Sequence, residues 1–336
     1  MKSVYAWHRP LMTVAALMLV STVVCVIGLL VDPRQITGLD VWAKPLKFSL
    51  SILVYSVTWA WLIAHLPRFR RVAHVAGTII AVALIVEQAL ILGAAAAGTT
   101  SHFNVSTPLA QGIWAAMAIS ITVLYVCTLL TTIAVFFLRL PTPSTTFAVR
   151  AGGVIALVGM GLAYLMTGPT PQQLHDFRGI AGAHTVGLPD GGPGLPVLGW
   201  STVAGDLRIP HFVGMHALQL LPLFAILLGW MGSRWRPLAD DRVRLRLVVV
   251  ATAAYAGALA LLTFQALAGQ SIVRPAGVFL WAGWALTLAA IVSAVIVVGM
   301  GRRPLGAPPA PASAGPGHGR RPTTVARSES LPRTRS

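Results

Sequence analysis

Residues 11–31 read LMTVAALMLVSTVVCVIGLLV, a run of 21 residues without a charged side chain. An α-helix rises about 1.5 Å per residue, so a run of this length crosses the roughly 30 Å hydrocarbon core of a bilayer. The run is longer than the apolar segment of an ordinary signal peptide, and it lacks a clear small-x-small cleavage site. We therefore interpret residues 11–31 as a first membrane span.

Further stretches pass the same test of length and apolar composition. They are residues 48–66, 72–93, 112–138, 151–167, 212–231, 247–267 and 278–300. Hydrophobic residues make up 56% of the 336-residue chain and charged residues only 10%, which is more apolar surface than a soluble fold of this size can bury. Only helices and closed barrels cross a membrane, and these runs are too long for barrel strands. We expect an all-α, polytopic transmembrane helix bundle of about eight spans.

The 25 lysines and arginines predict the orientation of these spans. If the N-terminus is inside, most of them fall in the inner segments and the C-terminal tail, as the positive-inside rule requires. We expect both termini to be cytoplasmic, in the cytoplasmic (inner) membrane of a bacterium. The net charge of +16 then reflects topology, so we expect the lipid bilayer as partner and no nucleic acid.

The chain divides into a transmembrane helical domain, residues 1–300, and a tail, residues 301–336. The tail is rich in Pro, Gly, Ser and Arg and has few bulky apolar residues, so we predict a disordered basic cytoplasmic segment. Residues 168–210 form a long outer loop that we expect to be ordered across the helix ends. Gln88-Ala89-Leu90 recurs as Gln265-Ala266-Leu267, which fits two four-helix halves; chance similarity between apolar segments is the alternative.

Within the expected spans the one carboxylate is Glu87, in the outer half of the third span. An ionisable group inside a bilayer is costly and usually faces a cavity or a charged partner. His216, near the outer end of the sixth span, is the partner that we predict. Glu87 is thus a candidate for proton handling.

Histidines gather on the expected outer side, and this bias defines the candidate site. The candidate ligand or proton-handling residues are Glu87, His102, His211 and His216, and the candidate supporting polar residues are Gln88, Asn104, Asp206, Arg208 and Gln219. In an unbroken helix, at about 100° per residue, the spacing of five turns His211 roughly 140° away from His216, so the two cannot chelate one ion. His216 and His102 are therefore the best metal candidates. Each of these histidines also has a structural alternative, as a buried or helix-capping side chain.

Two further pairs have plainer interpretations. Asp206 and Arg208 are close enough in sequence to pair with each other at the membrane interface. Lys44 and Lys47, at the start of the second span, are typical of interfacial anchors. The chain has no GxxxxGK[ST], HExxH, GxSxG or paired CxxC motif, so ATPase, zincin, α/β-hydrolase and zinc-finger functions lack support.

Three segments carry a resemblance to a known family. KPLKFSLS (44–51), SHFNVST (101–107) and GDLRIPHFVGMHALQ (205–219) resemble a functionally uncharacterised family of bacterial polytopic membrane proteins. The resemblance implies a membrane-embedded fold and no particular activity. The eight-span plan also looks like that of haem A synthases, but the fourth and eighth spans here contain no histidine, and we do not adopt that assignment.

The sequence leaves three classes of function open. The first is a redox or cofactor-binding protein with a polar His/Glu site at the outer face that takes haem, a metal ion or a quinone. The second is a proton-coupled secondary transporter or channel, and the third a non-catalytic membrane sensor or assembly factor. The sequence identifies neither a small-molecule ligand nor an oligomeric state.

Overall fold

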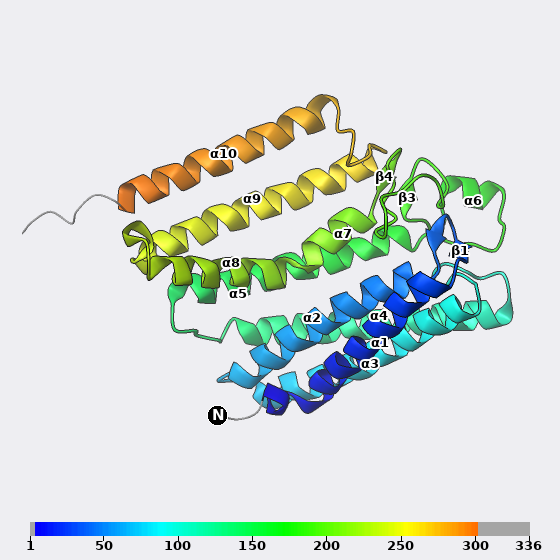
Figure 1. The fold of residues 1–336 in the computed structure, drawn as a ribbon, viewed down its shortest axis with the longest axis horizontal. Helices are drawn as coiled ribbons and strands as arrows, with labels where there is room; N and C mark the ends of the chain where they lie inside the picture. The colour runs from blue at the N-terminus through cyan, green and yellow to red at the C-terminus, as the bar shows by residue number, and fades with distance from the viewer. Residues whose placement is uncertain (1–3, 302–336) are drawn as a thin grey trace, which may run out of the picture. The chain divides into compact units, whose positions relative to one another are not determined.

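The structure, a computed structural model, describes residues 4–301, and nearly all of its elements are helices (Figure 1). These are α1 (Arg9–Val31), α2 (Ala43–His65), α3 (Arg70–Ala96), α4 (Pro108–Val135), α5 (Pro143–Gly161), α6 (Pro171–His175), α7 (Arg208–Met215), α8 (Ala217–Gly232), α9 (Asp241–Leu267) and α10 (Gly277–Gly301). Short 3-10 segments are η1 (Val4–Ala6), η2 (Leu162–Met166) and η3 (Arg236–Leu238). Paired strands are β1 (Gln35–Ile36) with β2 (Leu39–Asp40), and β3 (Thr185–Val186) with β4 (Gly205–Asp206).

The all-α fold predicted from the apolar runs is confirmed. Within residues 4–301, seven helices are long and apolar enough to cross a membrane, and the bent pair of α7 and α8 makes eight if it is one span. This is the pattern of a multi-pass membrane protein. Of the predicted tail, residues 301–336, Gly301 ends the last helix, and residues 302–336 lie outside the described residues.

The fifth span starts earlier than hydropathy indicates, at Pro143 instead of Ala151. Thr142 caps the helix, because its hydroxyl accepts a hydrogen bond from the backbone N–H of Thr145, and Pro143 occupies the first turn, where a missing N–H costs nothing. Arg150 lies inside this helix and donates to the carbonyl of Leu138 at 2.9 Å. The first turn, Pro143 to Thr146, is polar, and Arg150 follows one turn later, so a hydropathy criterion misses the start of the helix.

The sixth predicted span is not one straight helix. α7 and α8 meet at His216 with a bend of 45°. The angle of about 140° that we expected between His211 and His216 holds only for an unbroken helix, and the helix is broken here. Beside the bend, α7 packs backbone against backbone on α5: a Cβ added to Gly159 would lie 2.4 Å from the carbonyl carbon of Gly214.

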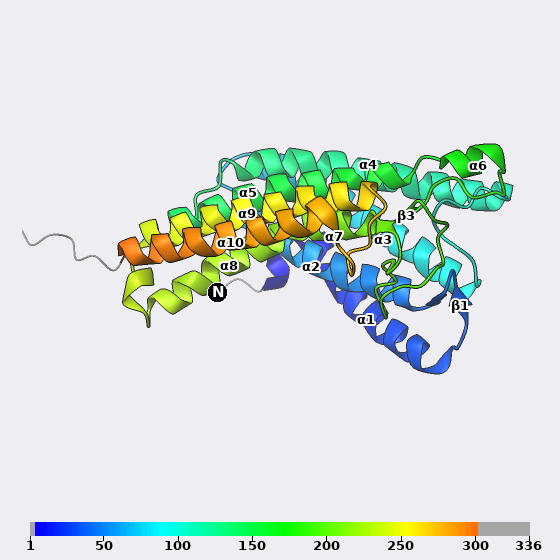
Figure 2. The same ribbon diagram turned by 90° about the horizontal axis from the view of Figure 1, so that it is seen from above.

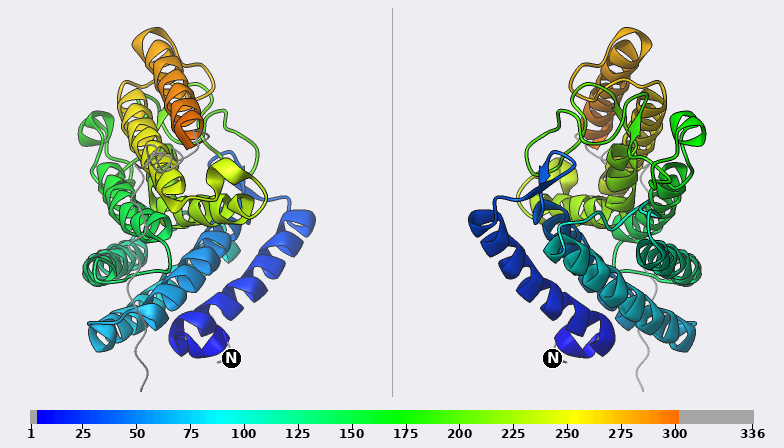
Figure 3. Two further views of the ribbon diagram at one scale, coloured as in Figure 1. Left: turned by 90° about the vertical axis from the view of Figure 1, so that its left-hand side faces the viewer. Right: turned by 90° about the vertical axis from the view of Figure 1, so that its right-hand side faces the viewer.

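The helices fall into two groups of four spans with the same pattern of contacts. In the first group α1 packs on α2 and α3, and α3 packs on α2 and α4. In the second group α5 packs on α7–α8 and α9, and α9 packs on α7–α8 and α10. Figure 3 shows the first group on one side of the bundle and the second group on the other, with α10 at the outer edge. This correspondence accords with the two four-helix halves predicted from the sequence echo.

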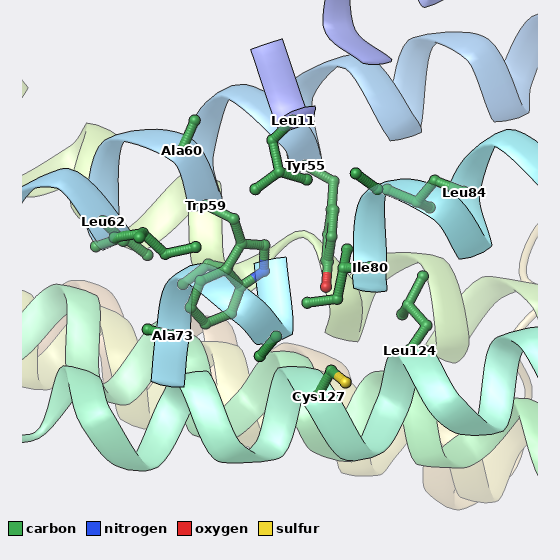
Figure 4. Close-up of a cluster of buried hydrophobic side chains, with 14 of the residues drawn as sticks. Leu11, Tyr55, Trp59, Ala60, Leu62, Ala73, Ile80, Leu84, Leu124 and Cys127 are labelled. Carbon is green, nitrogen blue, oxygen red and sulfur yellow. The ribbon is translucent and has the colours of Figure 1, made fainter. Parts of the chain in front are cut away.

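The first half has a core of interlocking side chains. Leu11, Tyr55, Trp59, Ile80 and Leu124 come from four helices and point toward one another (Figure 4). The Tyr55 hydroxyl lies 2.6 Å from the Thr128 hydroxyl, which joins α2 to α4. In a bilayer such packing and interhelical hydrogen bonds, more than burial from water, hold helices together.

One end of the bundle carries the long connections, and we name it the loop end: residues 32–42, 97–107, 162–207 and 268–276. Figures 1 and 2 show β1, β3 and α6 together at this end. The segment between α6 and α7 folds back on itself, because β3 pairs with β4 in an antiparallel register of Thr185 with Asp206. The predicted long outer loop is thus an ordered cover over the helix ends.

Candidate functional site

A cavity of about 1560 Å³ lies at the loop end, lined by α2, α3, α4, η2 and α7 and by the loops that cover them. It exceeds the roughly 300–1,000 Å³ of typical small-molecule pockets. Most of its wall is apolar or aromatic. The lining side chains with ionisable or phenolic groups are Asp40, Lys44, Lys47, Tyr55, Glu87, His102, Tyr125, Tyr164, His184, Asp190, Arg208 and His211.

Glu87 of α3 lines this cavity and is only 1% exposed. Neither of its carboxylate oxygens has a hydrogen-bond partner among residues 4–301. The nearest ionisable partner is His102, whose Nε2 lies 3.6 Å from Glu87 Oε1. His216, the partner that we predicted, bonds elsewhere, so that pairing is wrong. A buried carboxylate without donors costs free energy, which marks a place for a ligand or a proton.

His102 connects Glu87 to a lysine. Lys44 Nζ lies 3.0 Å from His102 Nδ1, and the Ser101 hydroxyl is equally close to the same nitrogen. An ammonium group can only donate, so we assign Nδ1 as the acceptor and place the ring hydrogen on Nε2, facing Glu87. Burial, and then the positive charge of Lys44, hold the pKa of His102 well below its usual range, which keeps the ring neutral at pH 7. We call Lys44, His102 and Glu87 the relay.

Lys44 and Lys47 of α2, which we predicted to be interfacial anchors, both line the cavity. Lys47 Nζ donates to the carbonyl of Leu198 at 2.6 Å and so ties α2 to the covering loop. Among residues 4–301, neither Lys44 nor Lys47 has a carboxylate oxygen within 4.0 Å. Their positive charge is therefore available to a ligand.

Asp206 and Arg208 pair with each other, which was one of the two interpretations of their sequence spacing. Arg208 Nε donates to Asp206 Oδ1 at 2.9 Å, and Asp206 is fully buried. The Asp206 carboxylate also accepts the backbone N–H of Ser201, at 2.8 Å. Asp206 thus holds the covering loop in place, and Arg208 alone of the two reaches the cavity wall.

The covering loop holds a second pair, a histidine with a carboxylate, that was not predicted from the sequence. His184 Nδ1 lies 2.6 Å from Asp190 Oδ2, and both residues line the cavity. Burial raises the pKa of Asp190, but hydrogen bonds from the His184 ring and from the backbone N–H groups of His184 and Thr185 outweigh it, so the pKa is lowered. Burial lowers the pKa of His184, against the opposing effect of Asp190. An ionised Asp190 accepts the Nδ1 hydrogen, which leaves His184 Nε2 as a hydrogen-bond acceptor.

The Phe103 ring lies between the two loop histidines, with ring centroids 6.0 Å from His102 and 4.9 Å from His184. The cavity thus presents one imidazole that donates from Nε2 and another that accepts at Nε2. The signal in the sequence was weak: His184 and Asp190 are six residues apart in a loop rich in Gly and Pro. An irregular loop has no repeating geometry, so contact between two of its side chains cannot be inferred from their spacing.

The other candidates are placed as follows. His216 lies at the bend, with Nε2 3.2 Å from the Ser51 hydroxyl and Nδ1 3.3 Å from Gln219 Oε1, and it does not line the cavity. His211 lines the cavity wall, and its Nδ1 lies 2.8 Å from the carbonyl of Gly159. The structure brings Glu87, His102 and His211 to one cavity and leaves His216 outside it.

Two supporting candidates have structural partners. Gln88 faces away from Glu87, and its Nε2 lies within 3.2 Å of the Ser21 and Ser49 hydroxyls and the Pro45 carbonyl. This network joins α1, α2 and α3. Asn104 accepts the backbone N–H of Ser106 at 3.1 Å and shapes the loop before α4.

The metal and haem hypothesis depends on how the donor side chains are arranged. In the described part of the chain, no group of three or more His, Cys, Asp or Glu residues is arranged to hold a metal ion. Both ring nitrogens of His216 are engaged with side chains, and His216 and His102 have separate partners. The donor set does not fit a metal centre built on His216 and His102.

Comparison of the chain with protein-family models, curated proteins and solved structures found no match.

Proposed function

We propose that the cavity binds a small molecule with a hydrogen-bond-accepting or anionic group, and that the relay of Lys44, His102 and Glu87 exchanges a proton with it. The observation that carries this proposal is Glu87, a buried carboxylate in the cavity wall with no hydrogen-bond donor among the described residues. His102 presents a hydrogen on Nε2 toward it, and Lys44 fixes that tautomer. Such a chain suits proton transfer between a bound molecule and Glu87.

The proposal keeps the proton-handling role expected for Glu87 and leaves out metal ligation. A quinone is one molecule that suits this site, because its carbonyl oxygens accept hydrogen bonds and take up protons on reduction. Lys44 and Lys47 would then face the acceptor group. Polar donors at one end of an otherwise apolar pocket fix the orientation of such a ligand.

We further propose that the loop end faces outward from a bacterial cytoplasmic membrane and that both termini are cytoplasmic. The support is the distribution of basic residues: among residues 4–301, most lysines and arginines lie at the end of the bundle opposite the loop end. The cavity then takes its ligand from outside the cell or from the outer leaflet.

A second candidate function is a proton-coupled secondary transporter. It is favoured by the position of the cavity, which is lined by helices of both four-span halves, and by the bent span α7–α8 beside it. Transporters with paired halves place their sites at such a junction. Transport requires that Glu87 gain access to both sides of the membrane in turn.

The test starts from ligand that co-purifies with the protein. Wild-type protein in detergent is examined by native mass spectrometry and by absorption spectroscopy, and the extracted molecule is added back to stripped protein between pH 5 and 8. We expect its affinity to depend on pH in the wild type and in the control Asp176→Asn, whose carboxylate is exposed. We expect Glu87→Gln to abolish that dependence. If no molecule co-purifies, or if Glu87→Gln keeps the wild-type pH profile, the proposal fails.

Flux measurements separate binding from transport. Protein in vesicles that carry a pH gradient would accumulate the extracted molecule if it is a transporter, and Glu87→Gln would remove the dependence on the gradient. Binding without accumulation at any gradient would exclude the second candidate.

A further inference from the structure

One side of the cavity wall faces the lipid-exposed surface of the bundle. Thr122 of α4 and Tyr164 of η2 both line the cavity, yet Thr122 is exposed and Tyr164 is 43% exposed. Both lie in helices of the membrane spans, well past the first turn of α4. A residue that faces the cavity and the outer surface at once belongs to a wall one side chain thick.

Side-chain contacts alone close this wall. The Tyr164 hydroxyl donates to the Thr122 hydroxyl at 3.1 Å, and the Tyr125 and Tyr164 rings meet edge to face with centroids 6.0 Å apart. At this point α5 has ended, and η2 continues the span as a tighter 3-10 turn of five residues, a common form at the C-terminus of an α-helix. The seam between α4 and α5–η2 also joins the two four-span halves. We call Thr122, Tyr125 and Tyr164 the seam.

The cavity is elongated along α4. Its lining residues on this helix recur at helical spacing on one face: Trp114, Met117, Ala118, Ile121, Thr122, Leu124 and Tyr125. At about 1.5 Å per residue, the stretch from Trp114 to Tyr125 covers roughly 16 Å. Apart from Thr122 this face is apolar or aromatic. It fits a long apolar chain better than a compact polar metabolite.

Helix α2 supplies the positive charge that would bind an anionic head group on such a chain. Lys44 and Lys47 line the same cavity, and neither has a carboxylate within 4.0 Å in the described part of the chain. Lys44 donates one hydrogen bond to neutral His102, and Lys47 donates one to the backbone carbonyl of Leu198. Each ammonium group has three hydrogens, so both lysines can donate to an anion as well.

We infer that the ligand is an anionic amphiphile of the bilayer, of the long-chain fatty acid type, and that it enters the cavity sideways through the seam between α4 and α5–η2. Its carboxylate or equivalent anion lies against Lys44 and Lys47, and its chain lies along the apolar face of α4. This inference rests on the proposed function and adds the class of ligand and its route.

The test uses protein reconstituted in vesicles and a fatty acid that carries a photoreactive diazirine on its chain. The probe is added through the lipid, samples are illuminated at increasing times, and mass spectrometry locates the label. We expect label on cavity-facing residues of α4, such as Met117, which is only 1% exposed. A fatty alcohol with the same diazirine should label the cavity at least about tenfold less, because it lacks the charge that the lysines bind.

Variants of the seam test the route. Tyr164→Ala removes the ring contact and the hydrogen bond and should speed cavity labelling by about tenfold, and Tyr164→Phe, which keeps the ring, should have a smaller effect. Thr122→Trp thickens the wall and should slow labelling. Val126→Trp is the matched control, because Val126 is one turn further along α4, exposed, and not part of the cavity wall.

The outcomes separate this inference from the proposed function. Equal labelling rates in Tyr164→Ala and wild type, or equal slowing by Thr122→Trp and Val126→Trp, would overturn the route. Equal labelling by acid and alcohol would overturn the anionic head. If a water-soluble molecule co-purifies and the lipid probe never reaches Met117, this inference fails and the proposed function stands. If neither a co-purified molecule nor the probe occupies the cavity, both fail.

Discussion

The contact between Gly159 of α5 and Gly214 of α7 allows a prediction about how the cavity wall is positioned. In Gly159→Ala the new methyl would lie 2.4 Å from the Gly214 carbonyl carbon and from the Met215 nitrogen. That is about 1 Å short of ordinary van der Waals contact, and the atoms it meets are backbone, so no side chain can rotate away. The two helices must separate. Overpacking of this kind costs about 1–3 kcal/mol, and we expect the upper part of that range.

The matched control is Gly229→Ala in α8, where an added Cβ would meet nothing within 4 Å. There the lower helix propensity of glycine is relieved, so this variant should be more stable than the wild type by about 0.5–1 kcal/mol. Thermal unfolding in detergent can be followed with a thiol-reactive dye, because Cys25 and Cys127 are free and buried. We expect Gly159→Ala to melt about 6 °C or more below the wild type. Equal melting temperatures for Gly159→Ala and the wild type would refute the close packing of α5 on α7.

Three further predictions follow from buried contacts. Protein stability should fall as the pH drops from 7 to 5. The pKa values of His102 and His184 are lowered in the folded state, so the unfolded chain binds more protons below pH 6.5. The free energy of unfolding should therefore fall by up to about 1.4 kcal/mol per pH unit for each group. The melting temperature of His184→Asn should depend less on pH over this range than that of the wild type. An unchanged dependence would contradict a neutral, buried His184 ring. Gln88→Leu should lose about 2 kcal/mol, because three hydrogen-bond acceptors lose their donor, and a wild-type melting temperature would show that the network is dispensable. His8 caps the first turn of α1, because its Nδ1 accepts the backbone N–H of Leu11, and its Nε2 bonds to the carbonyl of His74. We expect His8→Ala to speed hydrogen exchange in that turn alone. Unchanged exchange would contradict the cap.

The sequence determined the fold class, the approximate spans and the side on which polar residues gather. Each depends on local properties: a run of about 20 apolar residues must be a helix in a bilayer, and an ionisable group such as Glu87 within such a run requires a special environment. The limits of α5 were missed because Thr142 and Pro143 set its start through capping, in residues too polar for a hydropathy criterion.

Only the tertiary structure decided which polar groups meet. Depth along a span made His216 as good a partner for Glu87 as His102, but helix adjacency and rotation bring His102 to the carboxylate and turn His216 toward Ser51. Lys44 looked like an interfacial anchor, since a lysine at the start of a span has the same sequence pattern whether it faces lipid headgroups or an internal cavity. Hydropathy depends on the residues of one segment, whereas this cavity depends on how five separate segments pack together. Such packing cannot be inferred from the pattern of residues in a single sequence.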